Sequence, residues 1–577
     1  MKRLIVILLI VIAAIEAKQL HAQNALVNNL GANIWCNYNS IVKIKGSLLN
    51  GAGGSFENNG TTTIDSSFIN NGLARGNGKH RVGLHWINNE IFICDTSYTE
   101  LFGDNQLITG DSVTTYWRLE LSGTGIKTQE INSFVKHHLH LNDRELATEQ
   151  FNMHVLNSAV NSVDRTSGFV SSLGLGKFIR TTQNSAAYLF PTGSSLITTR
   201  YRPVILTPNN AAINDYGVRL ANNDATADGY DRTLVDSFVC ATNPLFYHLI
   251  SQSNGNSPAD IQIYYDENTD NFWDGIAQWK SPAMNQWVDL SPTSQNTQNP
   301  LSFVQRNQWN DYNPEPFILS RVRPGVPTIT GPDTICGATN GIYVGLPANA
   351  TQTYNWLITN GNINSNPDFN SAEVFWGPGG VQGTVELTVT APNGCTSYPA
   401  ILNSWVYPQV IAGFSTNPNS VLGSIPIVFI NTSTNSNAWQ WNFGNGATSQ
   451  LQNPTQIYNE SGTFSVMLIA SSFDGCSDTA YADVTIIDGL VIPNIFTPNG
   501  DKVNDLFEIS GTGFKNFKCL IYNRWGNLMF ESEAAQIQWD GTTLAGDPAA
   551  AGVYFVVLEI ETSAAPINYT GTVTIKR

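Results

Sequence analysis

The sequence is poor in charge, because only 13% of its 577 residues are Asp, Glu, Lys or Arg. Long stretches of Leu, Ala, Glu and Lys, which favour helices, are also missing, whereas Gly, Asn, Thr and Ser are abundant. This balance favours short strands joined by tight turns. Because single domains usually run to about 100–200 residues, the sequence predicts an all-β chain of several domains.

Basic clusters are absent too. Lys and Arg number 29 against 45 Asp and Glu, which gives a net charge of −16, and no run of basic residues alternates with aromatic ones. We therefore expect no nucleic-acid partner, since a phosphate backbone demands such a surface. An acidic, hydroxyl-rich surface suits a crowded exterior or divalent cations, and it also serves simply to keep a protein soluble.

Long apolar runs are missing except near the N-terminus, where two basic residues precede the apolar stretch Leu4–Ile15. This stretch is shorter than the roughly 20 residues that a membrane helix requires. The pattern indicates a signal peptide over residues 1–22, with cleavage after Ala22 or, as the alternative, after Ala17. The sequence thus predicts export by way of the periplasm, without a transmembrane anchor.

Cysteine pairs of the C-x-x-C type are missing, which argues against zinc and redox chemistry. The seven cysteines fit an oxidising compartment, and at least one of them must stay unpaired. Cys336 and Cys395 bracket one β-rich segment and are the favoured disulfide, while Cys36–Cys94 is a second candidate pair. Cys519 alternates with apolar residues along a strand, which favours a buried free thiol.

The N-terminal region, residues 23–175, contains a short repeat. SFENNG at residues 55–60 returns as SFINNG at residues 67–72, so that Phe56 and Phe68 lie twelve residues apart. Repeated strand–turn units can stack their Phe residues inward and their Asn side chains into a ladder, as in a β-solenoid. A Gly/Asn-rich meander with similar turns explains the same pattern, and both interpretations stay open.

Histidines cluster in VKHHLHLND, where strand alternation places His138 and His140 on one face. Such a pair can bind a transition metal, but the sequence shows no third ligand at a suitable spacing. The incomplete ligand set argues against a metal site.

Alternating strands separated by Pro, Gly, Asn and Asp turns predict a β-sandwich-like domain over residues 176–322. Its Asp266–Asn271 turn can hold a cation, although acidic turns also form for purely local reasons. Tryptophans at three positions can stack on sugars or fill a core: Trp273, Trp279 and Trp287.

Residues 323–408 and 409–488 also have the pattern of β-sandwiches. The second of these segments contains WQWNFGNG, NPTQIY and GTFSVMLIASSFDGC in this order, and it resembles the PKD domain, an immunoglobulin-like sandwich of extracellular proteins. The PKD family usually has Asp where this chain has Asn442 and Asn445, which argues against a cation at that turn. Residues 323–408 look like a looser relative.

The last segment, residues 489–577, carries five ordered motifs: VIPNIFTPNGDKVNDLFEI, FKCLIYNRWGNLMFES, WDGT, AAGVYFVVLEI and GTVTIKR. It resembles the gliding-motility-associated C-terminal domain of Bacteroidetes, the type B sorting domain of type IX secretion. The resemblance implies recognition by the type IX outer-membrane translocation machinery and delivery to the outer cell surface or the medium. The apolar run Val553–Leu558 predicts a strand that is buried on both faces.

Side-chain oxygens gather in one loop of this segment, at Asn499, Asp501, Asn504 and Asp505, with Glu508 a little further on. They can form a modest Ca²⁺ site that would staple the fold after export, although the spacing departs from that of an EF-hand. A Pro-Asn-Gly-Asp turn whose side chains bond their own backbone explains the pattern equally well.

Catalytic motifs are missing as well, since there is no G-x-S-x-G, no H-E-x-x-H and no complete phosphate loop. We therefore expect a non-enzymatic, modular secreted or surface protein. Its N-terminal region would bind a glycan or a surface protein, or act structurally, while the tandem sandwiches act as spacers. Two alternatives stay open: a glycan hydrolase or lyase with its active site in the N-terminal region, and a component of the gliding or adhesion apparatus.

Overall fold

The structure, a computed structural model, describes residues 25–364, 369–417, 420–422, 426–487, 491–509, 516–534, 536–561 and 567–577. Nearly all of its regular structure is β-strand, which confirms the predicted all-β class. The signal peptide expected over residues 1–22 lies outside the described residues. The chain divides into two compact units, of which the first reaches Val326 and also includes residues 351–353 and 389–398.

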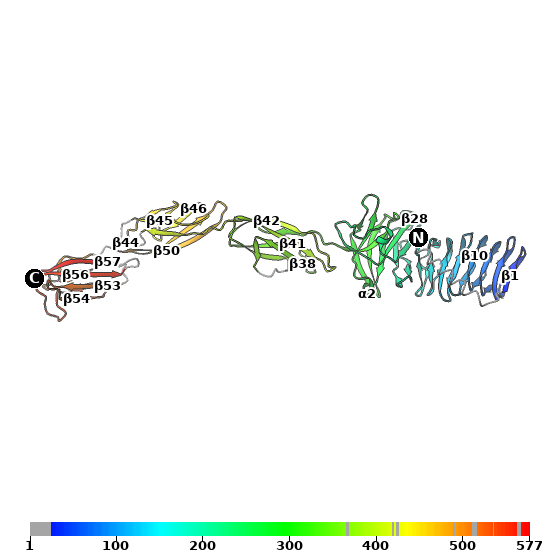
Figure 1. Cartoon of the computed structure of the whole chain (residues 1–577), viewed down its shortest axis with the longest axis horizontal. Coiled ribbons are helices and arrows are strands. Elements are labelled where there is room, and N and C mark those ends of the chain that lie inside the picture. The colour runs from blue at the N-terminus through cyan, green and yellow to red at the C-terminus, as the bar shows by residue number, and fades with distance from the viewer. Residues whose placement is uncertain are drawn as a thin grey trace, which may run out of the picture. The chain divides into compact units, whose positions relative to one another are not determined.

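The first unit begins with a parallel β-solenoid, whose successive rungs stack through backbone hydrogen bonds (Figure 1). Sheet A contains β1 (Ala25–Asn29), β4 (Gly46–Asn50), β7 (Phe68–Asn70), β10 (Trp86–Asn88), β13 (Gln106–Thr109), β15 (Ile126–Gln129), β17 (Glu145–Ala147) and β20 (Phe169–Ser171). Sheet B contains β2 (Asn33–Cys36), β5 (Ser55–Asn58), β8 (Leu73–Arg75) and β11 (Ile91–Ile93). Sheet C begins with β3 (Ile41–Ile44), β6 (Thr61–Ile64), β9 (Lys79–Val82), β12 (Tyr98–Leu101), β14 (Thr114–Leu121), β16 (Ser133–His140) and β18 (Met153–Val155).

Buried asparagines form the ladder that the sequence suggested. The side-chain amide of Asn29 donates to Asn50, that of Asn50 to Asn70, and that of Asn70 to Asn88, each over 2.8 Å. The ladder confirms the solenoid interpretation over the meander. Its steps are 21, 20 and 18 residues long, so the rung is longer than the twelve-residue repeat.

The twelve-residue repeat joins two different sheets. Phe56 lies on β5 of sheet B, whereas Phe68 lies on β7 of sheet A in the following rung. Both rings point into the solenoid interior, with their centroids 5.9 Å apart. The repeat therefore records two similar inward-facing strands, and it does not give the period of the solenoid.

Sheet C continues into the second domain without a break. β18 pairs in parallel with β21 (Phe178–Thr182), and β21 then pairs antiparallel with β26 (Asn214–Ala221). The sheet goes on through β28 (Tyr247–Asn254), β34 (Phe317–Val322), β30 (Gly275–Lys280) and β31 (Gln286–Asp289). The change of direction falls next to the expected domain limit at residues 175–176, and a single hydrophobic core extends across it.

A second antiparallel sheet completes this domain. It contains β22 (Tyr188–Phe190), β25 (Val204–Pro208), β29 (Ala259–Tyr265), β33 (Leu301–Trp309) and β32 (Thr293–Gln298). The inward residues of β29 and β33 join the same hydrophobic core as the solenoid.

The second unit contains three smaller β-domains, and their strands pair mainly in antiparallel fashion. The first domain has one sheet of β35 (Thr328–Thr330), β37 (Asn340–Leu346), β40 (Ser371–Trp376) and β39 (Gly361–Ile363), and another of β36 (Thr334–Cys336), β42 (Ala400–Tyr407), β41 (Val381–Thr390) and β38 (Thr353–Thr359). The second domain has one sheet of β43 (Phe414–Asn417), β45 (Ile427–Asn431) and β48 (Thr455–Gln456). Its other sheet contains β44 (Ser420–Leu422), β50 (Ser477–Ile487), β49 (Gly462–Ser471), β46 (Ala438–Asn442) and β47 (Thr448–Ser449). The third domain has one sheet of β51 (Ile495–Phe496), β57 (Ile567–Ile575), β56 (Gly552–Glu561), β53 (Asn516–Tyr522) and β54 (Leu528–Ser532). Its other sheet pairs β52 (Phe507–Ile509) with β55 (Ile537–Trp539).

Two disulfides join segments that lie far apart in the sequence. Cys240 pairs with Cys395 and Cys336 pairs with Cys476, with Cα–Cα distances of 6.1 and 5.6 Å. The predicted Cys336–Cys395 pair is therefore wrong. Cys395 belongs to the hairpin of residues 389–398, which packs within the first unit, whereas Cys336 ends β36 in the second.

The Asn393 side chain fixes this hairpin in the first unit. Its amide donates to the Asp274 carboxylate over 2.7 Å and to the Val322 carbonyl over 2.8 Å. The Arg323 guanidinium adds a hydrogen bond of 2.7 Å to the Thr396 carbonyl. These contacts hold the hairpin so that Cys395 lies beside Cys240 and does not pair with Cys336.

The second candidate pair, Cys36–Cys94, is also wrong, because both thiols are free. Cys36 ends β2 and Cys94 directly follows β11, which puts them in one column of sheet B, three rungs apart. Three strand spacings amount to about 14 Å, whereas a disulfide needs Cα atoms within roughly 7 Å. Cys519 is a buried free thiol, as predicted.

Replacing the ladder residue Asn50→Ala should destabilise the solenoid by about 3 kcal/mol, since the buried Asn70 oxygen and Leu73 carbonyl would lose their donor. Urea unfolding followed by circular dichroism measures the loss. The matched control is Asn37→Ala in an exposed turn, for which we expect a change within about 0.5 kcal/mol. Equal effects of the two substitutions would contradict the ladder's role.

Proteolysis of the denatured, unreduced protein should release the linked peptides Cys240–Cys395 and Cys336–Cys476, identified by mass spectrometry. Thiol titration in denaturant should find three free cysteines: Cys36, Cys94 and Cys519. The connectivity follows from the proximity of each pair in the fold. A peptide that links Cys336 to Cys395 would refute the observed arrangement.

Candidate functional site

The C-terminal domain is a small sandwich with its own core. Phe517, Cys519 and Ile521 on β53 face the same interior as Tyr554 and Val556 on β56. The other face of β56 is open, however, because Val553 and Phe555 are 49% and 51% exposed. The prediction of a strand buried on both faces is therefore wrong: no second layer covers this side among the described residues.

The Asn-Arg-Trp-Gly turn between β53 and β54 presents an aromatic ring to solvent. The Asn523 side-chain oxygen accepts the backbone N–H groups of Trp525 and Asn527 over 3.0 and 2.9 Å, and Gly526 takes a positive φ of 78°. The Arg524 guanidinium lies 4.9 Å from the centre of the Trp525 ring. A tryptophan that is 74% exposed on a turn held in this way is available to a partner.

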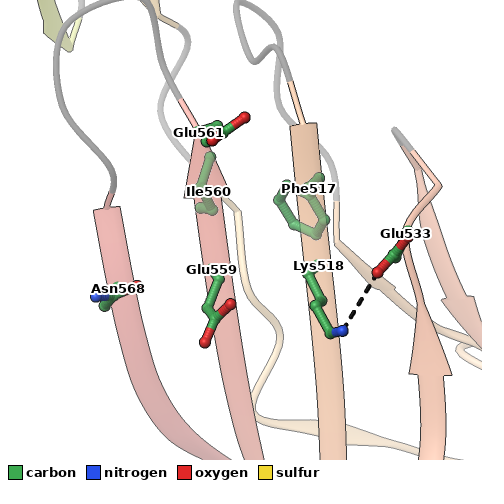
Figure 2. A pocket seen from close by; sticks show the side chains of 7 residues that line it. All are labelled: Phe517, Lys518, Glu533, Glu559, Ile560, Glu561 and Asn568. Atoms are coloured by element: carbon green, nitrogen blue, oxygen red, sulfur yellow. Dashed lines mark hydrogen bonds and ion pairs between the residues drawn. The ribbon is translucent and has the colours of Figure 1, made fainter.

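A shallow pocket lies at one end of the main sheet of this domain. Figure 2 shows Lys518, Glu559 and Asn568 side by side on β53, β56 and β57, in agreement with their strand register. Lys518 forms ion pairs of 3.1 and 3.2 Å with Glu531 and Glu533. Lys518 donates hydrogen bonds to both carboxylates, which raises the pKa of Lys518 and favours its protonated form.

The predicted calcium loop is held together by its own backbone. The Asp505 carboxylate accepts the N–H groups of Asn499, Gly500 and Lys502 over 2.8–2.9 Å. Asp501 accepts the N–H of Val503 over 2.8 Å. These bonds are the local turn geometry that the sequence allowed.

The remaining predicted ligands are also engaged. The Asn499 oxygen accepts the N–H of Asp501 over 3.1 Å, and the backbone carbonyl of Asn504 accepts the N–H of Thr497 over 2.7 Å. Glu508 instead accepts the side-chain amides of two glutamines on the β55 side, Gln536 and Gln538. The loop keeps Asn499, Asp501, Asn504 and Asp505 together. Glu508 lines the same pocket as Asn504 and Asp505, and calcium binding at this loop stays a prediction.

The acidic turn of the second domain is part of the core packing. It forms the short helix α2 (Glu267–Asp270), and the fully buried Asp270 makes a two-pronged ion pair with Arg202. The Asp266 side chain accepts the Asn268 N–H over 3.0 Å, a bond within the turn that favours the local explanation over a cation site. The three tryptophans of this region are at most 5% exposed, which makes them core residues and leaves no ring face for a sugar: Trp273, Trp279 and Trp287.

The histidine pair gains a third neighbour that the sequence did not suggest. His138 Nε2 lies 3.0 Å from one oxygen of Asp164, and His140 Nδ1 lies 2.9 Å from the other. Asp164 belongs to β19 (Val163–Asp164), which pairs in parallel with the end of β16 so that His140 and Asp164 are in register. A two-residue strand carries almost no sequence signal, which is why Asp164 was missed.

His140 and Asp164 lie at the end of an outward-facing column of sheet C, that is, a row of residues in register on successive rungs. Arg81, Glu100, Glu120 and His140 stand in register on successive rungs, beside a second outward column with Lys79, Tyr98 and Arg118. Burial raises the pKa of Glu100, but hydrogen bonds from Arg81 and Lys79 outweigh it and lower this pKa to about 2. The Tyr98 hydroxyl donates to Glu120.

Comparison with known families accounts for the last two domains. Residues 490–575 match the CHU_C type IX secretion signal domain, and residues 425–486 match the PKD domain. The chain thus carries a type IX secretion signal domain. Both predicted resemblances are confirmed, and in the PKD domain Asn442 and Asn445 accept backbone N–H groups at the turn.

Comparisons with individual proteins add little. No curated protein matches the chain. The PKD1 domain from Vibrio cholerae metalloprotease PrtV is 29% identical, covering 14% of this chain and 96% of its own, with a TM-score of 0.12. Dimeric latent PorU from Porphyromonas gingivalis is 10% identical, covering 46% of this chain and 36% of its own, with a TM-score of 0.13. Likenesses at these scores carry no argument about function.

The type IX signal domain makes the protein an export cargo that the type IX machinery handles. It is therefore secreted or displayed on the outer cell surface, as predicted. None of the helices within the described ranges is long and apolar enough to cross a membrane.

Protonation of Asp505 should weaken the loop. Backbone hydrogen bonds hold the pKa of Asp505 below its usual value, so its stabilisation is complete above the unfolded pKa, about 3.9, and disappears as the pH falls through the lower folded pKa. Asp505→Asn should therefore lower the Tm of the C-terminal domain at neutral pH and leave it almost unchanged near pH ~2. Thermal unfolding at both pH values is the test, with the exposed Asp547→Asn as control. A constant Tm difference would contradict the assignment.

Proposed function

We propose that this exported protein is a non-enzymatic binding or structural module, in which the outward face of sheet C contacts a glycan or a surface protein. Side chains from successive rungs provide a row of donors and acceptors on this face, and strand pairing fixes their spacing at about 4.8 Å. The two in-register columns support the proposal, since they give one continuous polar face instead of a single point.

The composition of this face suits recognition of polar ligands. Tyr98 and Arg118, half-exposed and exposed, stand in one column, and half-exposed His140 follows Glu120 in the other. Arginine and tyrosine combine hydrogen bonding with a flat surface, the two features that recur where proteins contact sugars and other proteins. Export to the cell surface or the medium places this face where such ligands occur.

A glycan hydrolase or lyase is the alternative that a specific observation favours. Glu100 and Glu120 face outward on adjacent rungs, as the paired carboxylates of a glycosidase do. Glu100, however, forms ion pairs with Lys79 and Arg81 over 2.6 and 2.9 Å, which keep it ionised. A general acid needs a raised pKa, and this arrangement therefore supports binding more than hydrolysis.

A role within the gliding or adhesion apparatus is a special case of the proposed binding. The sorting domain defines how the protein leaves the cell, whereas the function of the exported protein depends on other residues. Calcium at the 499–505 loop, if bound, would stabilise the C-terminal domain, which is separate from the sheet C face.

The full mature chain should be retained on a subset of an array of host and plant glycans and surface proteins, without new reducing ends or unsaturated products in the same samples. Arg118→Ala should weaken retention about tenfold, since it removes a charged donor from the face. Arg75→Ala, an exposed arginine on sheet B, is the matched control and should bind normally.

Cleavage products that disappear in Glu120→Gln would overturn the proposal in favour of the enzyme. Equal weakening by Arg118→Ala and Arg75→Ala would place binding elsewhere on the molecule. Circular dichroism and thermal unfolding of each variant should match the parent protein, since both arginines are solvent-exposed.

A further inference from the structure

His138, His140 and Asp164 form a compact cluster on the outward face of sheet C, here called the His-His-Asp cluster. One ligand atom from each residue can be chosen so that all three lie within 4.8 Å of one another. The side chains are 18%, 27% and 53% exposed, so an ion in solution can reach them.

Two features of the backbone hold these side chains together. His138 and His140 are alternate residues of β16, so strand geometry sends both to the same side. β19 pairs with the end of β16, and its register sets Asp164 directly beside His140. The two imidazole rings stack with centroids 4.0 Å apart and an angle of 20° between their planes.

The donor set is that of a transition-metal site. Neutral imidazole nitrogen and carboxylate oxygen are ligands that zinc and its neighbours in the first transition row share, at about 2.0–2.2 Å for zinc. The two nitrogens already point at one carboxylate over 2.9 and 3.0 Å. A cation between them requires only small side-chain rotations, because three ligand atoms about 3.4 Å apart surround a metal at about 2 Å.

We propose that the His-His-Asp cluster binds one divalent transition-metal ion, Zn²⁺ being the best fit, through His138 Nε2, His140 Nδ1 and an oxygen of Asp164. Three protein ligands leave a coordination position open for water or an external ligand. The ion would also tie β19 to β16, which are otherwise joined here by only two register positions. The inference shares His140 with the face described above, but it does not rest on the binding function proposed for that face.

A purely structural hydrogen-bonded group is the competing explanation, and the same sheet contains an example of one. His154 on β18 lies 3.0 Å from the Thr181 hydroxyl and 3.4 Å from Asp215, with no second histidine in the group. A hydrogen-bonded group of this kind is complete with one imidazole. The second imidazole on the same carboxylate distinguishes the His-His-Asp cluster and points to an ion.

The charges around the cluster do not oppose a cation. In sheet C, Glu120 is in register with His140 on the preceding rung, and Arg118 is in register with His138. Glu120 also accepts a hydrogen bond of 3.1 Å from Asn142, which keeps its carboxylate close to the end of the column. The two carboxylates Asp164 and Glu120 outnumber the one guanidinium of Arg118, so these neighbours give the cluster a negative surrounding charge.

Titration of Zn²⁺ into the untagged, EDTA-dialysed mature chain should reveal one saturable site by isothermal calorimetry. His138→Gln and Asp164→Asn should each weaken this binding at least about tenfold, because each removes a direct ligand. His154→Gln is the matched control and should leave the affinity unchanged. Asp164→Asn, a substitution at the most exposed ligand, keeps the test valid if His138→Gln fails to fold.

Zinc-edge X-ray absorption gives a readout that a merely structural role would not produce. The parent protein should show two imidazole nitrogens at about 2.0–2.1 Å, and His138→Gln should show one. Absence of saturable binding, equal affinity of the parent and both ligand variants, or a loss of affinity only in His154→Gln would each overturn the proposal.

Discussion

Parallel pairing of one rung on the next is the constraint on which the N-terminal region depends. Because each residue lies over its counterpart in the neighbouring rung, a buried polar side chain can find a partner along the same column, as Asn50 does between Asn29 and Asn70. The same rule arranges the exterior. Outward residues at equal register become rows, and chemistry that needs several side chains, such as that of Glu120, His140 and Asp164, is assembled by stacking.

At the transition from solenoid to antiparallel sheet, a buried cation bonds carbonyl groups from two different segments. The Arg180 guanidinium donates to the carbonyls of Leu189, Ala159 and Val160, and its side chain is fully buried. Burial lowers the pKa of Arg180 to about 10, so it stays charged at neutral pH. Arg180 lies on β21, the strand at which sheet C changes direction, and it links residues 159–160 to β22 there.

Local patterns allowed the fold class and the sorting domain to be predicted, because alternation, turn residues and motif order are visible in short stretches. They suggested the asparagine ladder but left a meander equally open. Contacts between segments that are distant in the sequence could not be predicted from it. The partner of Cys395 depends on where the 389–398 hairpin packs, which Asn393 and Asp274 decide from 119 residues apart. The third member of the His-His-Asp cluster was missed for the same reason, since only the register between β16 and β19 brings Asp164 to the histidines.

The placement of the cores also explains why the export signal says little about function. Phe496, Phe507 and Trp539 belong to a hydrophobic cluster confined to the C-terminal domain, whereas the solenoid and the second domain share another. Groups that share no core and no hydrogen-bond network couple weakly, so substitutions in one leave the stability of the other nearly unchanged. Changes to the outward face of sheet C should therefore leave the fold of the signal domain intact, and such a domain is compatible with many different tasks outside the cell.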